Sequence, residues 1–164
     1  MKVINIHKRI IDQPVERIAA LFKTLSTAND KMLETDKWPP MILNNGINAG
    51  SRGGHGPIRY RVDSYQPEKY IQFRFEKPKG FHGIHRFEII STNNNRSTEI
   101  RHIIEMNTSG GGSLIWLAAI RWLHDAFIED AFDKVENHFL TEKKKTNWSF
   151  WVRFLRKILK PKQR

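Results

Sequence analysis

The sequence predicts an α+β domain in which an antiparallel sheet is covered by one long helix near the C-terminus. Residues 41–107 alternate apolar and polar side chains between turn residues, the pattern of half-buried strands. Residues 113–140 instead repeat apolar side chains at helical spacing. Because the sheet and the helix each have one apolar face, we expect the helix to lie across that face of the sheet.

The first forty residues predict a strand followed by two short helices. KVINIHKRII, residues 2–11, is rich in β-branched residues and predicts a strand. In residues 12–25, Pro14 stands near a helix start and the apolar residues follow at helical spacing. We expect a second short helix over residues 29–35, before Trp38-Pro39-Pro40 prevents its continuation.

Two hairpins set the register of the predicted sheet. In the first, residues 66–69 form the turn, which places Tyr65 opposite Tyr70 and Ser64 opposite Ile71. In the second, Thr92 pairs with Ser97 around a polar turn. The same registers give these further pairs: Val62 with Phe73, Tyr60 with Phe75, Ile89 with Ile100, Phe87 with His102, and His85 with Ile104. Both hairpins then have one mainly apolar and one mainly polar face.

The long helix is predicted to bury one stripe and to expose the opposite side. Glu129 and Asp130 form a carboxylate pair, which we interpret as part of a solvated helix face. The predicted polar side consists of Asp125, Glu129, Asp133 and Glu136. The predicted buried stripe consists of Leu117, Ile120, His124, Phe127, Ala131, Val135 and His138.

The positive charge of the chain is concentrated at its C-terminus. The 164 residues carry a net charge of +11, but residues 143–164 hold nine of the 28 Lys and Arg and none of the 17 Asp and Glu. A nearly neutral body of residues 1–142 disfavours nucleic-acid binding by the domain itself. The absence of cysteine excludes disulfides and thiol catalysis. No signal peptide or membrane-spanning segment is evident, so we expect a cytoplasmic protein.

The C-terminal segment predicts an amphipathic helix that is separate from the body. At helical spacing the aromatic and aliphatic side chains of residues 148–159 fill one broad arc, and Ser149 with the cations fills the rest. This division is typical of a helix lying on an anionic membrane. Docking on the protein's own body or on a second copy is an alternative, as is another partner or nucleic acid. The expected membrane-binding residues are Trp148, Trp151, Arg153, Phe154, Arg156 and Lys157.

Two stretches carry a resemblance to a known superfamily. IIDQPVERIAALF, residues 10–22, and FIEDAFDKVENHF, residues 127–139, resemble the START-related, birch-pollen-allergen-like proteins, which include polyketide cyclase/dehydrase and lipid-transport types. The resemblance covers about residues 3–140, with Gln13 where alanine is commoner. It implies a helix-grip fold, in which a curved sheet wraps around the long helix and often leaves a cavity for lipids, sterols, polyketides or quinones. A minority of such proteins are enzymes, so the fold leaves the activity open.

The predicted register directs four polar side chains into the interior, namely Tyr60, His85, His102 and His124. Polar groups among apolar neighbours are typical of ligand pockets, so we expect a hydrophobic small molecule or lipid to bind there. A cyclase-like enzyme that uses His85, His102 or Tyr60 for proton transfer is the alternative, and a filled interaction or chaperone-like domain is a third. The predicted cavity residues are Tyr60, Val62, Phe73, Phe75, His85, Phe87, His102, Ile104, His124 and Phe127.

The sequence predicts neither a metal site nor a cofactor. His82 and His85 lie three residues apart on a strand and therefore point to opposite faces. His55, His102 and His124 would have to converge from distant parts of the chain. The glycine-rich residues 49–56 lack the spacing of a phosphate-binding loop, so we expect a flexible loop or an edge-strand bulge. The resemblance implies that such a loop borders the cavity mouth.

Overall fold

The computed structural model describes residues 1–159, which form a seven-stranded antiparallel sheet and four α-helices. The strand order is β1-β7-β6-β5-β4-β3-β2. The strands are β1 (Lys2–Ile11), β2 (Ile42–Leu43), β3 (Arg52–His55), β4 (Ile58–Gln66), β5 (Tyr70–Lys77), β6 (Phe81–Thr92) and β7 (Ser97–Thr108). The helices are α1 (Val15–Phe22), α2 (Gly111–Ile115), the π-helical turn η1 (Trp116–Ile120), α3 (Arg121–Asn137) and α4 (Phe150–Leu159).

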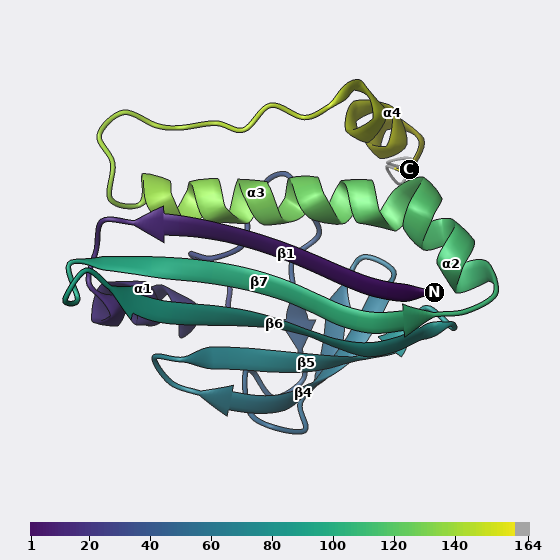
Figure 1. Ribbon diagram of the computed structural model, residues 1–164, viewed down its shortest axis with the longest axis horizontal. Helices are drawn as coiled ribbons and strands as arrows, with labels where there is room; N and C mark the ends of the chain where they lie inside the picture. The colour runs from purple at the N-terminus through teal and green to yellow at the C-terminus, as the bar shows by residue number, and fades with distance from the viewer. Residues whose placement is uncertain (160–164) are drawn as a thin grey trace.

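The helix α3 runs along the sheet beside β1, as Figure 1 shows. Helix α1 packs against β6 and β7 near one end of the sheet. After α3 the chain runs back along the helix, which brings α4 above the region of α2 and η1 (Figure 1). The predicted α+β class, with an antiparallel sheet and a long helix near the C-terminus, is therefore confirmed.

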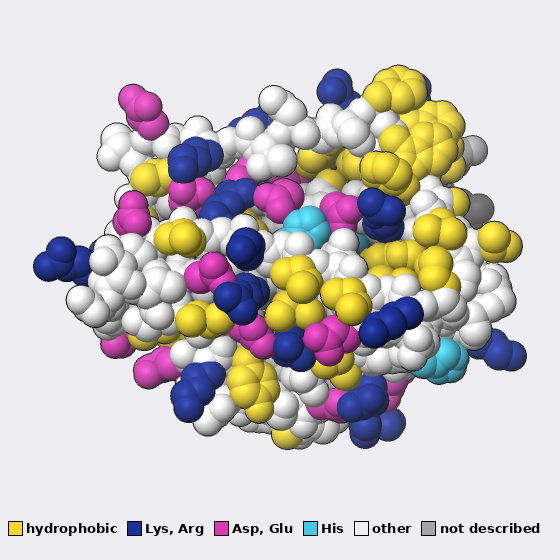
Figure 2. Space-filling model, in the orientation of Figure 1, with side chains coloured by type: hydrophobic (Ala, Val, Ile, Leu, Met, Phe, Trp, Pro, Cys, Tyr) yellow, Lys and Arg dark blue, Asp and Glu magenta, His cyan; other side chains and the backbone are white. Residues whose placement is uncertain are grey.

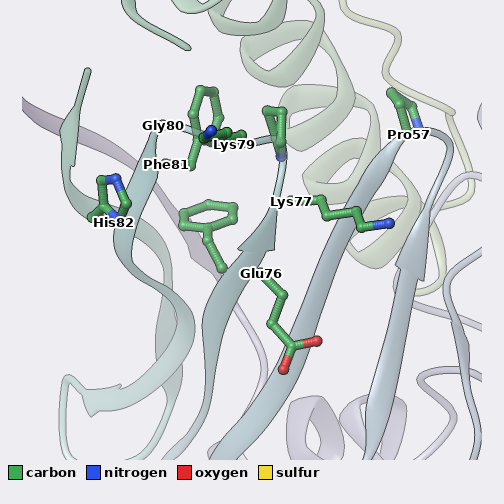
Figure 3. A pocket seen from close by; sticks show the side chains of 9 residues that line it. Pro57, Glu76, Lys77, Lys79, Gly80, Phe81 and His82 are labelled. Carbon is green, nitrogen blue, oxygen red and sulfur yellow. The ribbon is translucent and has the colours of Figure 1, made fainter. Parts of the chain in front are cut away.

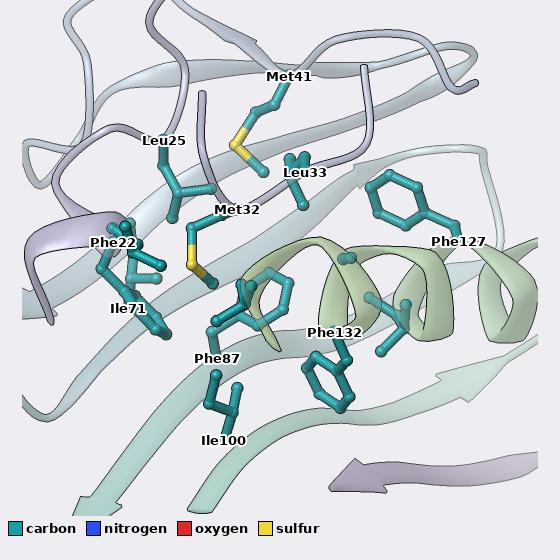
Figure 4. Close-up of a cluster of buried hydrophobic side chains, with 14 of the residues drawn as sticks. Phe22, Leu25, Met32, Leu33, Met41, Ile71, Phe87, Ile100, Phe127 and Phe132 are labelled. Carbon is teal, nitrogen blue, oxygen red and sulfur yellow. The ribbon is translucent and has the colours of Figure 1, made fainter. Parts of the chain in front are cut away.

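The main core lies between the sheet, α3 and the loop that joins α1 to β2. This loop contributes buried side chains to the core, and without them there would be empty space under the helix. Figure 4 shows the arrangement: Ile71, Phe87 and Ile100 rise from the sheet, Phe127 and Phe132 come from α3, and Leu25, Met32, Leu33 and Met41 come from the loop.

The predicted register is confirmed for the second hairpin and partly wrong for the first. All the pairs predicted between β6 and β7 occur, from Thr92 with Ser97 to His85 with Ile104. Between β4 and β5, Tyr60 pairs with Phe75 and Val62 with Phe73, but a bulge follows. Beyond it Tyr65 lies opposite Ile71 rather than Tyr70, because the extra residue shifts the pairing by one.

The predicted second short helix over residues 29–35 is wrong, because that segment forms turns and bends. The carboxylate of Asp30 accepts hydrogen bonds from the backbone N–H groups of Ser26, Met32 and Leu33. A side chain that satisfies nearby backbone donors in this way competes with helix formation. The loop is held in an irregular conformation that buries Met32 and Leu33.

The long helix departs from the predicted stripe at both ends. The π-helical turn η1 changes the angular position of the side chains before α3, so Leu117 is exposed while Trp116 is buried. At the other end, His138 is exposed just beyond α3. The central members Phe127, Ala131 and Val135 are buried as predicted. Within residues 1–159, no helix is both long and apolar enough to cross a membrane.

Candidate functional site

The ten residues predicted to line a cavity all lie in the space between the sheet and α3. Eight are buried, whereas Phe75 and His124 are half-buried. Tyr60 and Phe73 are completely inaccessible to solvent, and Phe132 of α3 fills the same layer. The interior is therefore packed with side chains, and a ligand could enter it only if some of these side chains moved.

A row of imidazole rings crosses this interior. The hydroxyl of Tyr60 hydrogen-bonds to Nδ1 of His55 at 3.0 Å, and its ring lies 4.8 Å from that of His85. Nδ1 of His85 is 3.4 Å from Nε2 of His102. The ring of His102 is in turn 4.9 Å from that of His124. Each of these five residues comes from a different element, namely β3, β4, β6, β7 and α3. Residues distant in sequence therefore meet in the interior.

Three nitrogens of this row have no hydrogen-bond partner within residues 1–159: Nε2 of His85, Nδ1 of His102 and Nε2 of His124. Burial lowers the pKa of all four histidines, that of His55 to about 4 and those of His85 and His102 well below the usual value. The four rings are therefore neutral at pH 7. A buried, unpaired polar atom costs about 1–3 kcal/mol, so these nitrogens are candidates for binding a polar group of a ligand.

A network of charged side chains lies next to His124, at the end of this row, where β1 meets α3. Nδ1 of His7 donates to Glu129 at 2.7 Å and Nε2 donates to Asp125 at 3.1 Å. Burial alone would lower the pKa of His7, but the hydrogen bonds to Asp125 and Glu129 outweigh it and raise the pKa to about 9. Hydrogen bonds from His124 and His7 likewise outweigh burial and lower the pKa of Asp125. His7 is therefore an imidazolium ion held between two carboxylates.

The acidic side of α3 is not solvated, which corrects the expectation from the sequence. Arg9 of β1 forms ion pairs with Glu129 at 2.7 Å, Asp133 at 2.5 Å and Glu136 at 3.2 Å. Asp130, next to Glu129, is buried. The sequence did contain a signal for this interface. Asn5, His7 and Arg9 alternate along one face of β1, and three of the acids recur at intervals of four along α3.

A surface hollow of about 590 Å³ lies where β5 turns into β6 (Figure 3). Phe75 and Phe81 line it, with their rings 5.7 Å apart, and so do Lys77 and Pro57. The Phe75 ring also lies 4.9 Å from His85, so one aromatic side chain separates the hollow from the interior. The remaining lining residues are Glu76, Pro78, Lys79, Gly80 and His82.

The glycine-rich residues 49–56 form turns and the strand β3, which lies between β4 and the edge strand β2, not a phosphate-binding loop. A Cβ atom on Gly53 would lie 1.8 Å from the carbonyl oxygen of Ile42, so this close pairing with β2 requires glycine. The strand ends at His55, whose ring stacks on Phe127 at 4.9 Å. His55 was not among the predicted cavity residues. Its position depends on strand pairing between short edge strands, which local sequence does not specify.

Solved structures of similar shape place this architecture in a known fold. Norcoclaurine synthase from Thalictrum flavum superposes with a TM-score of 0.65 and 11% identity, over 87% of this chain and 96% of that one. The chain has the helix-grip fold. The protein XoxI from Bacillus cereus (TM-score 0.60, 11% identity, 85% and 96% of the two chains) and CalU16 from Micromonospora echinospora (0.56, 9%, 96% and 91%) share it. No protein-family model and no curated protein sequence matches the chain.

The inner edge of the C-terminal helix α4 packs on the helix-grip domain. Asp130 of α3 accepts hydrogen bonds of 2.8 Å each from Lys37, Trp38 and Trp148. The guanidinium of Arg156 lies 4.2 Å from the ring of Trp38 and 4.4 Å from that of Trp148. Trp148 and Arg156, predicted to face a membrane, are therefore occupied by contacts with the domain. The buried side chains of Val152 and Leu155 complete this docked edge.

The outer edge of α4 belongs to an exposed apolar surface, which we call the apolar patch. Trp151 donates a hydrogen bond from Nε1 to the carbonyl of Ala118, and this contact joins α4 to η1. Figure 2 shows hydrophobic side chains gathered over α4 and beside α2, at the same end of the molecule. The apolar patch consists of Leu114, Ile115, Leu117, Trp122, Phe150, Trp151, Phe154, Ile158 and Leu159.

The charges nearest to the apolar patch in sequence are all positive. Arg121, Arg153 and Lys157 are exposed, and neither residues 111–122 nor residues 143–159 contain an acid. The predicted membrane-binding residues Trp151, Arg153, Phe154 and Lys157 thus remain accessible to solvent. The further tail cations at positions 160, 162 and 164 lie outside the described residues.

Proposed function

We propose that this protein binds a hydrophobic small molecule or lipid, and exchanges it with an anionic membrane surface on which the apolar patch docks. The observation that carries the proposal is the apolar patch itself, which exposes nine large side chains at one end of a helix-grip domain. Contiguous exposed apolar surface of this kind marks interaction sites in most proteins that have it. The accompanying cations favour a surface that is both apolar and negatively charged.

The chemistry of the apolar patch suits the headgroup region of a bilayer. Burial of one large apolar side chain contributes about 1.5–3 kcal/mol when it is complete, and Phe150 is 80% exposed in the free protein. Each Lys or Arg near an anionic leaflet contributes about 1 kcal/mol. With its inner edge fixed to α3, α4 presents an outer edge that needs no further ordering before it binds.

The hollow supplies a site beside this surface. Its volume is about 590 Å³, and Phe75 and Phe81 give it two aromatic side chains that a hydrophobic ligand would contact. Gly80 at its edge packs so closely on Gly112 that a Cβ on Gly112 would lie 3.0 Å from Gly80. Leu114 and Ile115 of the apolar patch follow within one turn of α2. A ligand would therefore travel a short path from a docked membrane to the hollow.

Other proteins of this fold support the ligand-binding part of the proposal. A structure of norcoclaurine synthase in complex with dopamine and hydroxybenzaldehyde matches the chain with a TM-score of 0.64 and 12% identity, over 88% of this chain and 90% of that chain. At this identity the similarity concerns the fold alone. In the present chain Phe75 lines the hollow and its ring lies 4.9 Å from that of the buried His85, so a ligand that displaced Phe75 would meet one imidazole.

Vesicle co-sedimentation tests membrane docking. The full chain should sediment with vesicles of phosphatidylcholine and phosphatidylserine, and less with phosphatidylcholine alone. The double variant Phe150→Ser, Phe154→Ser should lose most of the binding. The matched control is Ile4→Ser, Ile6→Ser, which removes two exposed isoleucines of β1 that do not belong to the apolar patch. Equal loss of binding in both double variants, or in neither, would contradict docking through the apolar patch.

Native mass spectrometry and organic extraction of the purified protein test ligand binding. A hydrophobic molecule should be found in a 1:1 complex. Phe75→Trp should reduce its occupancy, because the larger ring enters the hollow. Tyr70→Trp, on the same strand but outside the lining residues, should retain it. A protein that is empty after expression and after incubation with lipid extract would refute this part of the proposal.

An enzyme of the cyclase or dehydratase type is the second candidate. It is favoured by one specific observation, the unpartnered nitrogens of His85 and His102 beside Tyr60. Neutral imidazoles can accept or donate a proton if a substrate reaches them. The two functions differ in their response to His85→Phe: an enzyme would lose turnover of its bound ligand, whereas a binding protein would return the ligand chemically unchanged.

A further inference from the structure

Three potential metal-ligand atoms converge where β1 meets α3. Each of His7, His124 and Asp125 offers one atom within 4.8 Å of the other two. Oδ1 of Asp125 lies 3.1 Å from Nε2 of His7 and 3.5 Å from Nδ1 of His124. Ligand atoms about 2.0–2.2 Å from a tetrahedral Zn²⁺ ion are separated by about 3.3–3.6 Å, so these spacings fit such a site with small adjustments.

The surroundings of His7 are those of a metal-ligating histidine. Its other nitrogen, Nδ1, donates to Oε1 of Glu129 at 2.7 Å. Glu129 is held in turn by Arg9, whose Nη2 donates to Oε2 at 2.7 Å. A carboxylate on the second ring nitrogen fixes the orientation of a ligating imidazole and increases its basicity. This arrangement directs Nε2 of His7 toward Asp125.

A fourth ligand is available at the same place. Nδ2 of Asn5 donates to Oδ1 of Asp125 at 3.0 Å, while Oδ1 of Asn5 is buried without a hydrogen-bond partner among residues 1–159. A half-turn of the amide would bring this oxygen next to the carboxylate, where an ion between the two oxygens would remove their repulsion. The Asp125 side chain is 31% exposed, so an ion can reach the cluster from solvent.

We propose that His7, His124 and Asp125 bind one divalent transition-metal ion, with Asn5 or a water molecule as the fourth ligand. The ion takes the place of the proton on Nε2 of His7, and this proton is released to solvent. Two imidazoles and one carboxylate suit Zn²⁺, whereas Mg²⁺ and Ca²⁺ prefer ligand sets made of oxygen alone. The ion clamps β1 to α3 across an interface that is otherwise held by ion pairs. Sequence reasoning did not predict this site, because its ligands come from elements about 120 residues apart. The site is independent of ligand binding at the hollow.

Calorimetric titration of the EDTA-treated full chain with Zn²⁺ is the test. One equivalent should bind and raise the Tm, and Mg²⁺ at the same concentration should do neither. His7→Gln and Asp125→Asn should abolish stoichiometric binding. Glu129→Gln should weaken it by about 10- to 100-fold, the usual effect of removing a partner of a ligating histidine. His82→Gln, which changes an exposed histidine elsewhere, should leave the affinity unchanged.

Absence of a 1:1 complex, or equal affinity in the wild type, His7→Gln and Asp125→Asn, would overturn the proposal. If a substitution prevents folding, as judged by circular dichroism, the wild-type chain still decides the question. With Co²⁺ in place of Zn²⁺, the wild-type chain should show the intense visible absorption of a tetrahedral Co²⁺ ion. The weak spectrum of hexa-aquo Co²⁺ would show that no such site forms.

Discussion

Mild acid is expected to destabilise the helix-grip domain steeply, because four interior histidines are buried in the neutral form. In the unfolded chain each histidine takes up a proton near pH 6.5, whereas burial keeps the folded pKa of His55, His85, His102 and His124 lower. The unfolded state therefore binds more protons below pH 6.5, and stability is lost as the pH falls. His7 is already protonated when folded and changes little in this range.

The size of the effect follows from proton linkage. Between pH 6.5 and 5.5 each of His55, His85 and His102 should cost about 1 kcal/mol, so these three together should cost about 3 kcal/mol, and His124 adds to the loss. This loss is a large part of the 5–15 kcal/mol that stabilises a typical domain. The pH range lies above the titration of ordinary carboxylates, so the histidines dominate it.

Urea unfolding of the metal-free chain at several pH values, followed by tryptophan fluorescence, measures this loss. His85→Phe replaces one imidazole among aromatic neighbours and should make the loss about 1 kcal/mol smaller over the same range. His82→Gln, at an exposed position, should have no effect on it. A free energy of unfolding that is constant between pH 6.5 and 5.5, or an unchanged loss in His85→Phe, would show that the buried histidines do not cause the acid sensitivity.

Three further predictions concern the charged interfaces and α4. Trp148→Phe keeps an aromatic ring but removes the hydrogen bond to Asp130, and urea unfolding should show a loss of about 1.5–3 kcal/mol; the exposed Trp122→Phe should change stability by less than about 0.5 kcal/mol. Because the folded pKa of His7 is raised to about 9, its contribution is complete below pH 6.5 and is lost as the pH rises through 9. The stability of EDTA-treated wild type should therefore fall between pH 7 and 9.5 more steeply than that of His7→Gln. A chain ending at residue 142 should have a lower Tm than the full chain in calorimetry, since it lacks the buried Val152; an equal Tm would show that α4 adds no stability.

Sequence periodicity predicted those parts of the fold that depend on local pattern. The alternation in β6 and β7 fixed their pairing, because a shift by one residue would have exposed Phe87 and Ile89. The same reasoning was wrong beyond Val62 in β4, where a bulge interrupts the alternation. A bulge depends on twist and on neighbouring strands, and these are not encoded in the spacing of apolar residues.

The candidate site was predictable only in part, for a similar reason. His85 and His102 followed from one hairpin, whereas the convergence of His7, His55 and His124 depends on how β1, β3 and α3 pack. The C-terminal helix shows the same limit. Its amphipathic pattern was evident, but the division between a docked inner edge and a free outer edge depends on Asp130, which looked like a solvated acid in the sequence.

Ligand transfer from vesicles requires both docking and binding, so it tests the two parts of the proposed function together. The protein would be incubated with phosphatidylcholine and phosphatidylserine vesicles that also contain total lipid extract, re-isolated by size exclusion, and examined by native mass spectrometry. We predict one hydrophobic molecule per chain in the wild type and much lower occupancy in Phe150→Ser, Phe154→Ser. A wild-type chain that returns empty, or a double variant with wild-type occupancy, would contradict the proposed function.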